Sequence, residues 1–203
     1  MNRIKFKALV SCAIVLILAA IAFYFFYRPW ALSWGATRHE VSRTMPGDDL
    51  VADPTFNATR AVAIHAPPQS VWPWLVQMGY RRAGFYSYDR LDNANVPSAE
   101  NIISKYQVLK VGDTIPMSRV LNATVVTLVP NQLLVMVFRA GRTTWSWTWV
   151  LQDEGVNGTR MITRLRVGER RVFPKLMLDA VEIIMMRKCM LGIKRRAESA
   201  QHV

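Results

Sequence analysis

Cysteine and histidine are scarce in this chain of 203 residues, which contains two cysteines and three histidines. A disulfide framework needs more cysteines, and Cys12 lies in a hydrophobic segment, so no disulfide is predicted. The histidines His39, His65 and His202 are scattered, and no cysteine or histidine spacing matches a zinc site. We therefore expect neither a metal ion nor a cofactor.

Two motifs of common enzyme classes are also missing. The chain has no glycine-rich phosphate-binding loop. His65 has no evident serine, cysteine or aspartate partner for a nucleophilic triad. Internal repeats and low-complexity segments are absent, and the length fits one domain with some residues left for an anchor.

Acidic residues are few: 14 stand against 26 lysines and arginines, which gives a formal net charge of +12. Such an excess is typical of proteins that contact nucleic acid or anionic membranes. The basic residues are dispersed, and no run is longer than the KRR at 194–196. No nucleic-acid recognition motif is present, so we expect no nucleic-acid partner.

One long uncharged segment covers residues 8–27 and reads ALVSCAIVLILAAIAFYFFY. Twenty helical residues span about 30 Å, the thickness of the hydrocarbon core of a bilayer. Three basic residues precede it, and Tyr27, Arg28 and Trp30 close it as residues at a membrane interface do. A cleaved signal peptide would have a shorter apolar core and a small-residue exit.

The sequence therefore predicts a single-pass anchor over residues 1–28, with the lipid bilayer as a partner and the cell membrane as the location. The compact basic cluster before the segment favours a cytoplasmic N-terminus, so the domain is expected outside the cytoplasm. Residues 29–56 read as a polar juxtamembrane linker, in which Thr37 and Glu40 form a possible capping box for a short helix.

Residues 57–203 are expected to form one domain. Alternating patterns and turn signals predict a first strand, two short helical segments and an antiparallel run of five strands. The expected ranges are 57–66 for the first strand, 67–79 and 81–94 for the helical segments, and 106–117, 123–129, 133–138, 143–151 and 159–167 for the later strands. A long helix over 173–197 has a wide apolar arc and is the only element able to cover the sheet.

Several stretches, in this order, resemble the SRPBCC or START-like superfamily, and its membrane-anchored, polyketide cyclase/dehydrase-like bacterial branch in particular. They are WGATRHE…MPGDDL, TRAVAIHAPPQSVWPWLVQMG, RAGFYSYDRLDN, LKVGDTIP, TWSWTWVL and TRMITRLRV. The resemblance implies a helix-grip fold of the α+β class, with a curved antiparallel sheet wrapped around the C-terminal helix and a hydrophobic cavity between them. Two departures, RLDNA at 90–94 for the family's WLENL and IISK at 102–105 for its ILPE, bear on the cavity entrance.

Three tryptophans two residues apart, Trp145, Trp147 and Trp149, are expected on one face of a strand. The residues between them, Thr144, Ser146 and Thr148, suit a solvated face, so the indoles should point towards the long helix. Core packing, a cavity wall and a membrane-interface belt are the three readings of this row.

The remaining candidates for the ligand site lie on helical segments. Met177 and Met185 of the last helix could pack in the core or form an adaptable lid over a ligand. Trp72 is expected on the buried face of the first short helix, and Tyr86 and Tyr88 are placed beside the cavity. Tyr86, Tyr88 and Asp89 are weak catalytic candidates, because such clusters in turns usually bond local backbone. Arg160, Arg164 and Arg166 should be solvated on the outer face of the last strand, or form an anion site or contact lipid headgroups.

The combined reading is a membrane-anchored START-like domain that binds a hydrophobic small molecule, such as a lipid or an isoprenoid, between sheet and helix. We expect a binding protein rather than an enzyme. The alternatives are a cyclase or hydrolase that uses tyrosine and aspartate groups, and an interaction protein with no open cavity, which a volume below about 300 Å³ would favour. The oligomeric state is not predicted.

Overall fold

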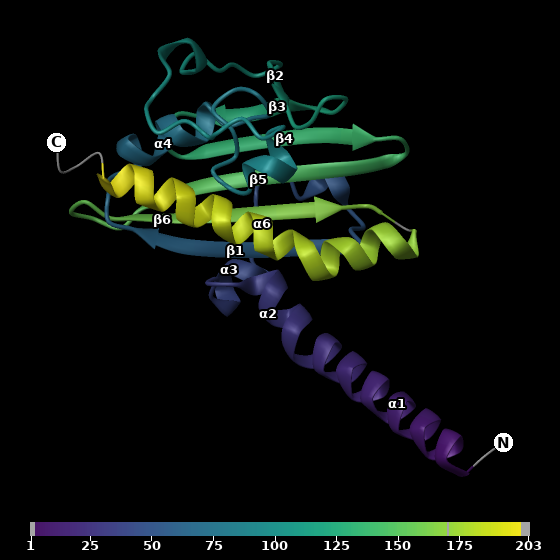
Figure 1. Cartoon of the computed structure of the whole chain (residues 1–203). Coiled ribbons are helices and arrows are strands. Elements are labelled where there is room, and N and C mark those ends of the chain that lie inside the picture. Colours follow the sequence, from purple (N-terminus) through teal and green to yellow (C-terminus); the bar gives the residue numbers. More distant parts are fainter. Residues whose placement is uncertain (1–2, 170, 200–203) are drawn as a thin grey trace.

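The computed structural model describes residues 3–169 and 171–199. The chain begins with a continuous helix built from α1 (Arg3–Ala22), a π-helical turn η1 (Phe23–Tyr27) and α2 (Arg28–Ser33). This helix projects away from the rest of the protein (Figure 1). Its segment Val10–Ser33 is long and apolar enough to cross a membrane, and its most apolar part is not buried against the domain. It is therefore not a core helix.

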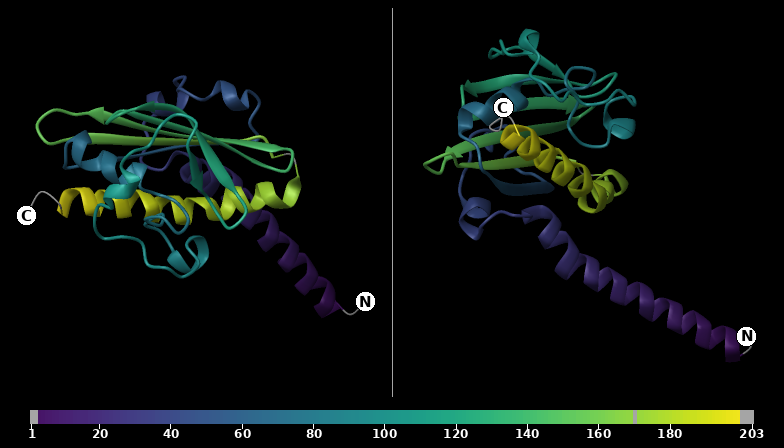
Figure 2. Two further views of the ribbon diagram at one scale, coloured as in Figure 1. Left: turned by 90° about the horizontal axis from the view of Figure 1, so that it is seen from above. Right: turned by 60° about the vertical axis from the view of Figure 1, so that its left-hand side comes forward.

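The domain is an α+β fold, as predicted. Six strands form one antiparallel sheet in the order β1-β6-β5-β4-β3-β2, which places the first strand beside the last. Their bounds are Phe56–Ile64 for β1, Thr114–Pro116 for β2, Asn122–Val129 for β3, Leu133–Ala140 for β4, Thr143–Asp153 for β5 and Thr159–Val167 for β6. The long helix α6 (Val172–Ser199) runs across the concave face of the curved sheet (Figures 1 and 2).

The concave face of the sheet and the inner face of α6 enclose the main core. Alternate residues of β5 and β6 point into it, including Trp147, Trp149 and Leu165. On α6 the inner face supplies Cys189, Met190 and Ile193, and the short helix α4 (Pro68–Val76) closes one end through Trp74 and Leu75. The wide apolar arc expected on the last helix is thus used for covering the sheet.

The region between α4 and the sheet contains less regular structure than the sequence predicted. The expected helical segment 81–94 contains only α5 (Asp89–Asp92), because Arg81, Tyr86 and Ala94 have positive φ angles that a helix does not allow. The expected strand 106–117 shortens to β2, preceded by the 3₁₀ turn η3 (Ser104–Tyr106). Asp113 accepts a hydrogen bond from the Lys110 amide at 2.8 Å and so stabilises a turn within that range.

The outer face of the sheet is where the structure departs most from expectation. Ser146 and Thr148 of β5 are buried rather than solvated, because residues 35–52 fold across this face. The cover consists of α3 (Arg38–Ser42), a loop and the 3₁₀ turn η2 (Asp49–Val51). The predicted capping box of Thr37 and Glu40 is confirmed at the start of α3.

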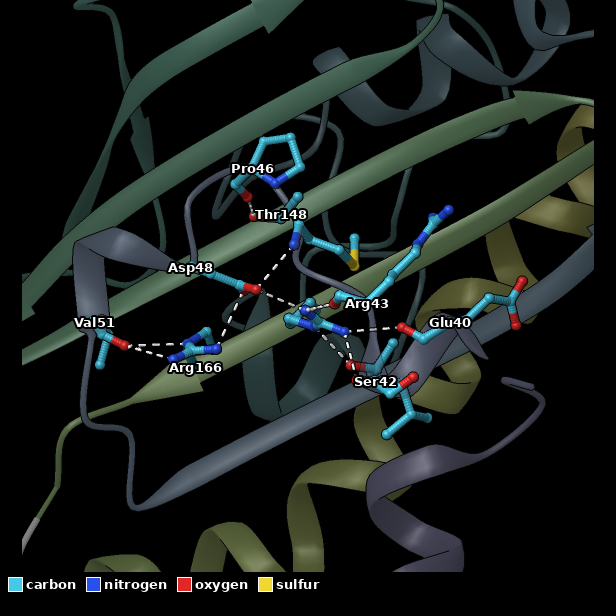
Figure 3. A network of polar contacts seen from close by, with 12 residues as sticks. Glu40, Ser42, Arg43, Pro46, Asp48, Val51, Thr148 and Arg166 are labelled. Carbon is cyan, nitrogen blue, oxygen red and sulfur yellow. Dashed lines mark hydrogen bonds and ion pairs between the residues drawn. The ribbon is translucent and has the colours of Figure 1, made fainter. Parts of the chain in front are cut away.

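The three arginines of β6 hold this cover in place, so the prediction that they are solvated is wrong. Arg164 is 3% exposed and donates to the backbone oxygens of Glu40, Val41 and Arg43, each at 2.9 Å, and to Asp48 Oδ2 at 2.8 Å. The same network continues along the strand (Figure 3). Arg160 Nε donates to Glu40 Oε1 at 2.7 Å, and Arg166 Nη2 donates to Val51 O at 2.9 Å.

These contacts also argue against the alternative of an anion site on β6. Each guanidinium already has acceptors from the chain's own backbone and carboxylates. The Arg160 guanidinium, opposed in part by burial, lowers the pKa of Glu40 to about 2, so this carboxylate stays charged at neutral pH. The stretches WGATRHE and MPGDDL, which carry part of the family resemblance, therefore build the outer cover of the sheet.

Candidate ligand cavity

A cavity of about 260 Å³ lies between the concave face of the sheet and the middle of α6. Its walls come from α5 and the loop before it, from the residue that follows β2, from β4, β5 and β6, and from α6. The lining residues are Phe85, Ser87, Asp92, Met117, Phe138, Trp145, Trp147, Leu165, Glu182, Met185, Met186 and Cys189. Nine of these twelve residues are apolar, the exceptions being Ser87, Asp92 and Glu182, so the cavity suits a largely apolar ligand.

Two of the three tryptophans form part of this wall. Trp145 stacks on Phe138 with ring centroids 5.2 Å apart, and its indole nitrogen has no hydrogen-bond partner among the described residues. Trp147 donates from Nε1 to Thr163 Oγ1 at 2.9 Å, and that hydroxyl donates to Thr148 O at 3.0 Å. The orientation of Trp147 is therefore fixed by a hydrogen bond, whereas the buried indole nitrogen of Trp145 has none.

Trp149 lies on the same face but is not among the residues that line the cavity. It is 0% exposed, and its ring centroid lies 5.2 Å from that of Trp147. For Trp149, the core-packing reading therefore describes the structure. The expectation that all three indoles point inward is correct, but only two of them line the cavity.

The other predicted ligand-site residues are divided between several places. Met185 lines the cavity, whereas Met177 is 46% exposed on the far side of α6. Trp72 is half-buried against the core without lining the cavity. Tyr88 faces a separate groove outside α6, where Lys188 Nζ lies 3.8 Å from its ring centroid.

Tyr86 and Asp89, two of the weak catalytic candidates, make structural contacts. The Tyr86 hydroxyl donates to Trp74 O at 3.0 Å and accepts from Gln77 Nε2 at 3.0 Å. Burial raises the pKa of this phenol far above its ordinary value. Asp89 accepts hydrogen bonds from both the hydroxyl and the amide of Ser98, at 2.5 and 3.1 Å. Neither side chain lines the cavity.

Two carboxyl groups outside the predicted site residues, Asp92 and Glu182, line the cavity. Burial, aided by the charge of Asp89, raises the pKa of Asp92 to about 6. Burial also raises the pKa of Glu182, against the opposing effect of the Arg60 guanidinium 2.6 Å from Glu182 Oε2. Glu182 lies on α6, 122 positions after Arg60 on β1, and no sequence pattern links the two residues. Only the fold could therefore reveal this ion pair.

The chemistry available in the cavity is limited. Burial raises the pKa of the Cys189 thiol, so it remains protonated and is a poor nucleophile. Among the described residues, no group of three or more histidine, cysteine or acidic side chains could hold a metal ion. What remains is a largely apolar wall with two carboxyl groups of raised pKa, Asp92 and Glu182.

No family model matches the chain, and no curated protein is significantly similar to it. Solved structures do share its fold. A protein from Nitrosospira multiformis is 9% identical, with a TM-score of 0.50 over 72% of this chain and 99% of its own. A protein of unknown function from Staphylococcus aureus is 11% identical, with a TM-score of 0.50 over 72% and 97% of the two chains.

A protein from the dynemicin biosynthetic locus is also similar, at 14% identity and a TM-score of 0.46 over 71% of this chain and 48% of its own. At such identities the likeness shows the fold alone. The two structures with a TM-score of 0.50 therefore support the α+β architecture, and the function must be argued from the cavity.

Proposed function

We propose that this chain is a membrane-anchored START-like domain that binds a compact hydrophobic molecule in the cavity between the sheet and α6. The observation that carries the proposal is the cavity itself, with Trp145, Trp147 and Phe138 on one side and Met185 and Met186 on the other. Rigid aromatic groups supply apolar area, and methionines adapt to different shapes.

The volume of about 260 Å³ lies just below the 300 Å³ criterion given above, so it counts in favour of the interaction protein and against a drug-sized ligand. A ligand of this cavity must therefore be compact. An apolar cavity of about 150 Å³ already accepts benzene in an engineered protein. We therefore expect a ligand of one or two rings, or a short isoprenoid, rather than a diacyl lipid. The apolar faces of Trp145 and Trp147 supply the contact area for such a ligand.

Membrane attachment through the helix Val10–Ser33 is part of the proposal. Apolar ligands partition into bilayers, so a tether keeps the cavity near the source of its ligand. The cytoplasmic N-terminus and the extracytoplasmic domain stay predictions from the distribution of basic residues.

Native mass spectrometry of the full chain, purified from its host membrane in mild detergent, tests the proposal. We expect a bound small molecule that neither the detergent nor the phospholipids explain. The variant Leu165→Phe, which adds volume to the cavity wall, should lose that molecule, whereas Leu91→Phe on the exposed α5 should keep it. Identical spectra from the two variants, or no adduct in the wild type, would support the interaction protein without an open cavity.

One observation favours the enzyme alternative, in a modified form. Asp92, three residues from the candidate Asp89, lies in the cavity wall with a pKa near 6, which suits a general acid or base. An enzyme in which Asp92 acts would lose turnover of the co-purified molecule in Asp92→Asn while still binding it. A binding protein would show no turnover in either form.

A further inference from the structure

The helix α6 has apolar side chains on two faces, and the sheet covers only one of them. Met177, Val181, Ile184 and Leu191 point away from the sheet and are 46, 38, 50 and 39% exposed. Their spacings of four, three and seven residues place them in one row along the helix. Four exposed apolar side chains that share one face of a helix indicate a contact surface.

A groove of about 480 Å³ runs beside this row, between α6 and the base of the N-terminal helix. Its lining residues are Tyr27, Trp30, Tyr88, Ile183, Ile184, Arg187, Lys188 and Leu191. Arg187 lies 5.3 Å from the ring of Trp34, and Lys188 lies 3.8 Å from the ring of Tyr88. Within the described part of the chain, no carboxylate forms an ion pair with either cation. The groove therefore combines apolar walls with two positive charges.

The position of the groove is fixed by contacts between the N-terminal helix and the domain. Tyr27 donates its hydroxyl hydrogen to Ala180 O at 2.5 Å, and Arg28 Nε lies 3.0 Å from Asp179 Oδ1. The buried Arg60 bridges the two helices, since its Nε donates to Ala31 O at 2.8 Å and its Nη2 pairs with Glu182. The groove thus opens where the apolar helix meets the domain, at the level of an interfacial aromatic pair, Tyr27 and Trp30.

We propose that this groove binds an anionic phospholipid of the bilayer that the N-terminal helix enters. Arg187 and Lys188 would contact the phosphate group, and Ile184 and Leu191 would contact the acyl chains. The charge of the groove and its continuity with the apolar helix both favour a lipid over a soluble protein partner. The inference rests on the membrane attachment proposed above and is independent of the ligand in the inner cavity.

The test uses the full chain in nanodiscs of equimolar phosphatidylglycerol and phosphatidylcholine, followed by mild detergent and native mass spectrometry of the retained lipid. We expect the wild type to retain phosphatidylglycerol in preference, by about fivefold for each cation that contacts it. The double variant Arg187→Gln with Lys188→Gln should retain both lipids about equally. The control Lys110→Gln with Arg119→Gln removes the same charge near β2, at the sheet edge opposite β1, and should keep the preference.

A second double variant, Arg187→Lys with Lys188→Arg, separates charge from folding because it preserves both cations. It should retain phosphatidylglycerol as the wild type does. An undiminished preference in Arg187→Gln with Lys188→Gln overturns the proposal, as does loss of the preference in the charge-preserving exchange. The cavity variant Leu165→Phe should leave the lipid preference unchanged, so failure of the groove and failure of the inner cavity can be told apart.

Discussion

Replacing Arg164 by methionine should detach residues 35–52 from the outer face of the sheet. Arg164 is almost completely buried and makes five hydrogen bonds, of which three go to backbone oxygens, one to Asp48 and one to Thr59. Methionine has a similar length but no donor, so it leaves these acceptors unpaired and Asp48 without its nearest cation.

The expected cost follows from the burial. Removing one partner of a buried, hydrogen-bonded ion pair typically costs about 3–5 kcal/mol. Asp48 keeps a weaker contact with Arg166 at 3.4 Å and an amide donor from Met45 at 2.9 Å, which favours the lower end of that range. For a protein of this length, about 3 kcal/mol corresponds to a fall in Tm of about 10 °C.

Thermal unfolding of the full chain in detergent, followed by circular dichroism, measures this fall. Hydrogen exchange provides the local readout, because amides in residues 35–52 should exchange faster in Arg164→Met than in the wild type. Arg139→Met, at an exposed position of β4, is the matched control and should change Tm by no more than about 2 °C. A Tm of Arg164→Met within the same narrow range, with unchanged exchange, would refute the role assigned to this network.

Three further predictions concern the cavity wall and α6. Because burial raises the pKa of Asp92 to about 6, its contribution to stability is complete below pH 4 and is lost as the pH rises through 6. Because the site is half-exposed, the effect is reduced: the unfolding free energy of Asp92→Asn relative to the wild type should rise by about 1–2 kcal/mol between pH 4 and pH 7. Denaturant titrations at several pH values measure this difference, and equal pH profiles of the two proteins would contradict the assigned pKa. Trp147→Phe loses a buried hydrogen bond and should lower the unfolding free energy by about 1 kcal/mol more than Trp145→Phe, which loses none. Trp145→Phe should instead alter ligand retention. Equal unfolding free energies of the two variants would contradict this contrast. Gly192→Ala places a methyl group 2.7 Å from Tyr86 Cβ and against the Tyr86 carbonyl. It should lower the unfolding free energy by about 1–3 kcal/mol, although alanine has the higher helix propensity. An unchanged Tm would contradict this and would show that the loop around Tyr86 shifts at little cost.

The apolar helix and the sheet could be predicted from local patterns. An uncharged run of twenty residues is long enough for a bilayer, and alternation in 143–151 and 159–167 gives strands with defined faces. Local patterns were less reliable at 81–94 and 106–117, where positive φ angles and turns replace a helix and most of a strand. These turns depend on contacts of individual side chains, which periodicity does not record.

For the candidate site, the sequence identified the strand and the helix that form the walls, and three of the lining residues: Trp145, Trp147 and Met185. It chose Asp89 rather than Asp92 from the same short segment, and it missed Glu182, because that carboxyl group looks like part of a solvated stripe on the last helix until its surroundings are known. It also placed Tyr88 and Met177 at the cavity, although they lie on the opposite side of α6.

By itself, the sequence determined that a membrane-length apolar helix precedes an antiparallel sheet and that the indoles of β5 point inward. Period-two alternation is a property of the strand backbone and needs no knowledge of distant residues. Only the tertiary structure decided which indoles meet the cavity, because that depends on where α6 crosses the sheet. It alone also decided that the arginines of β6 are buried, because their acceptors come from a segment more than a hundred residues earlier in the chain.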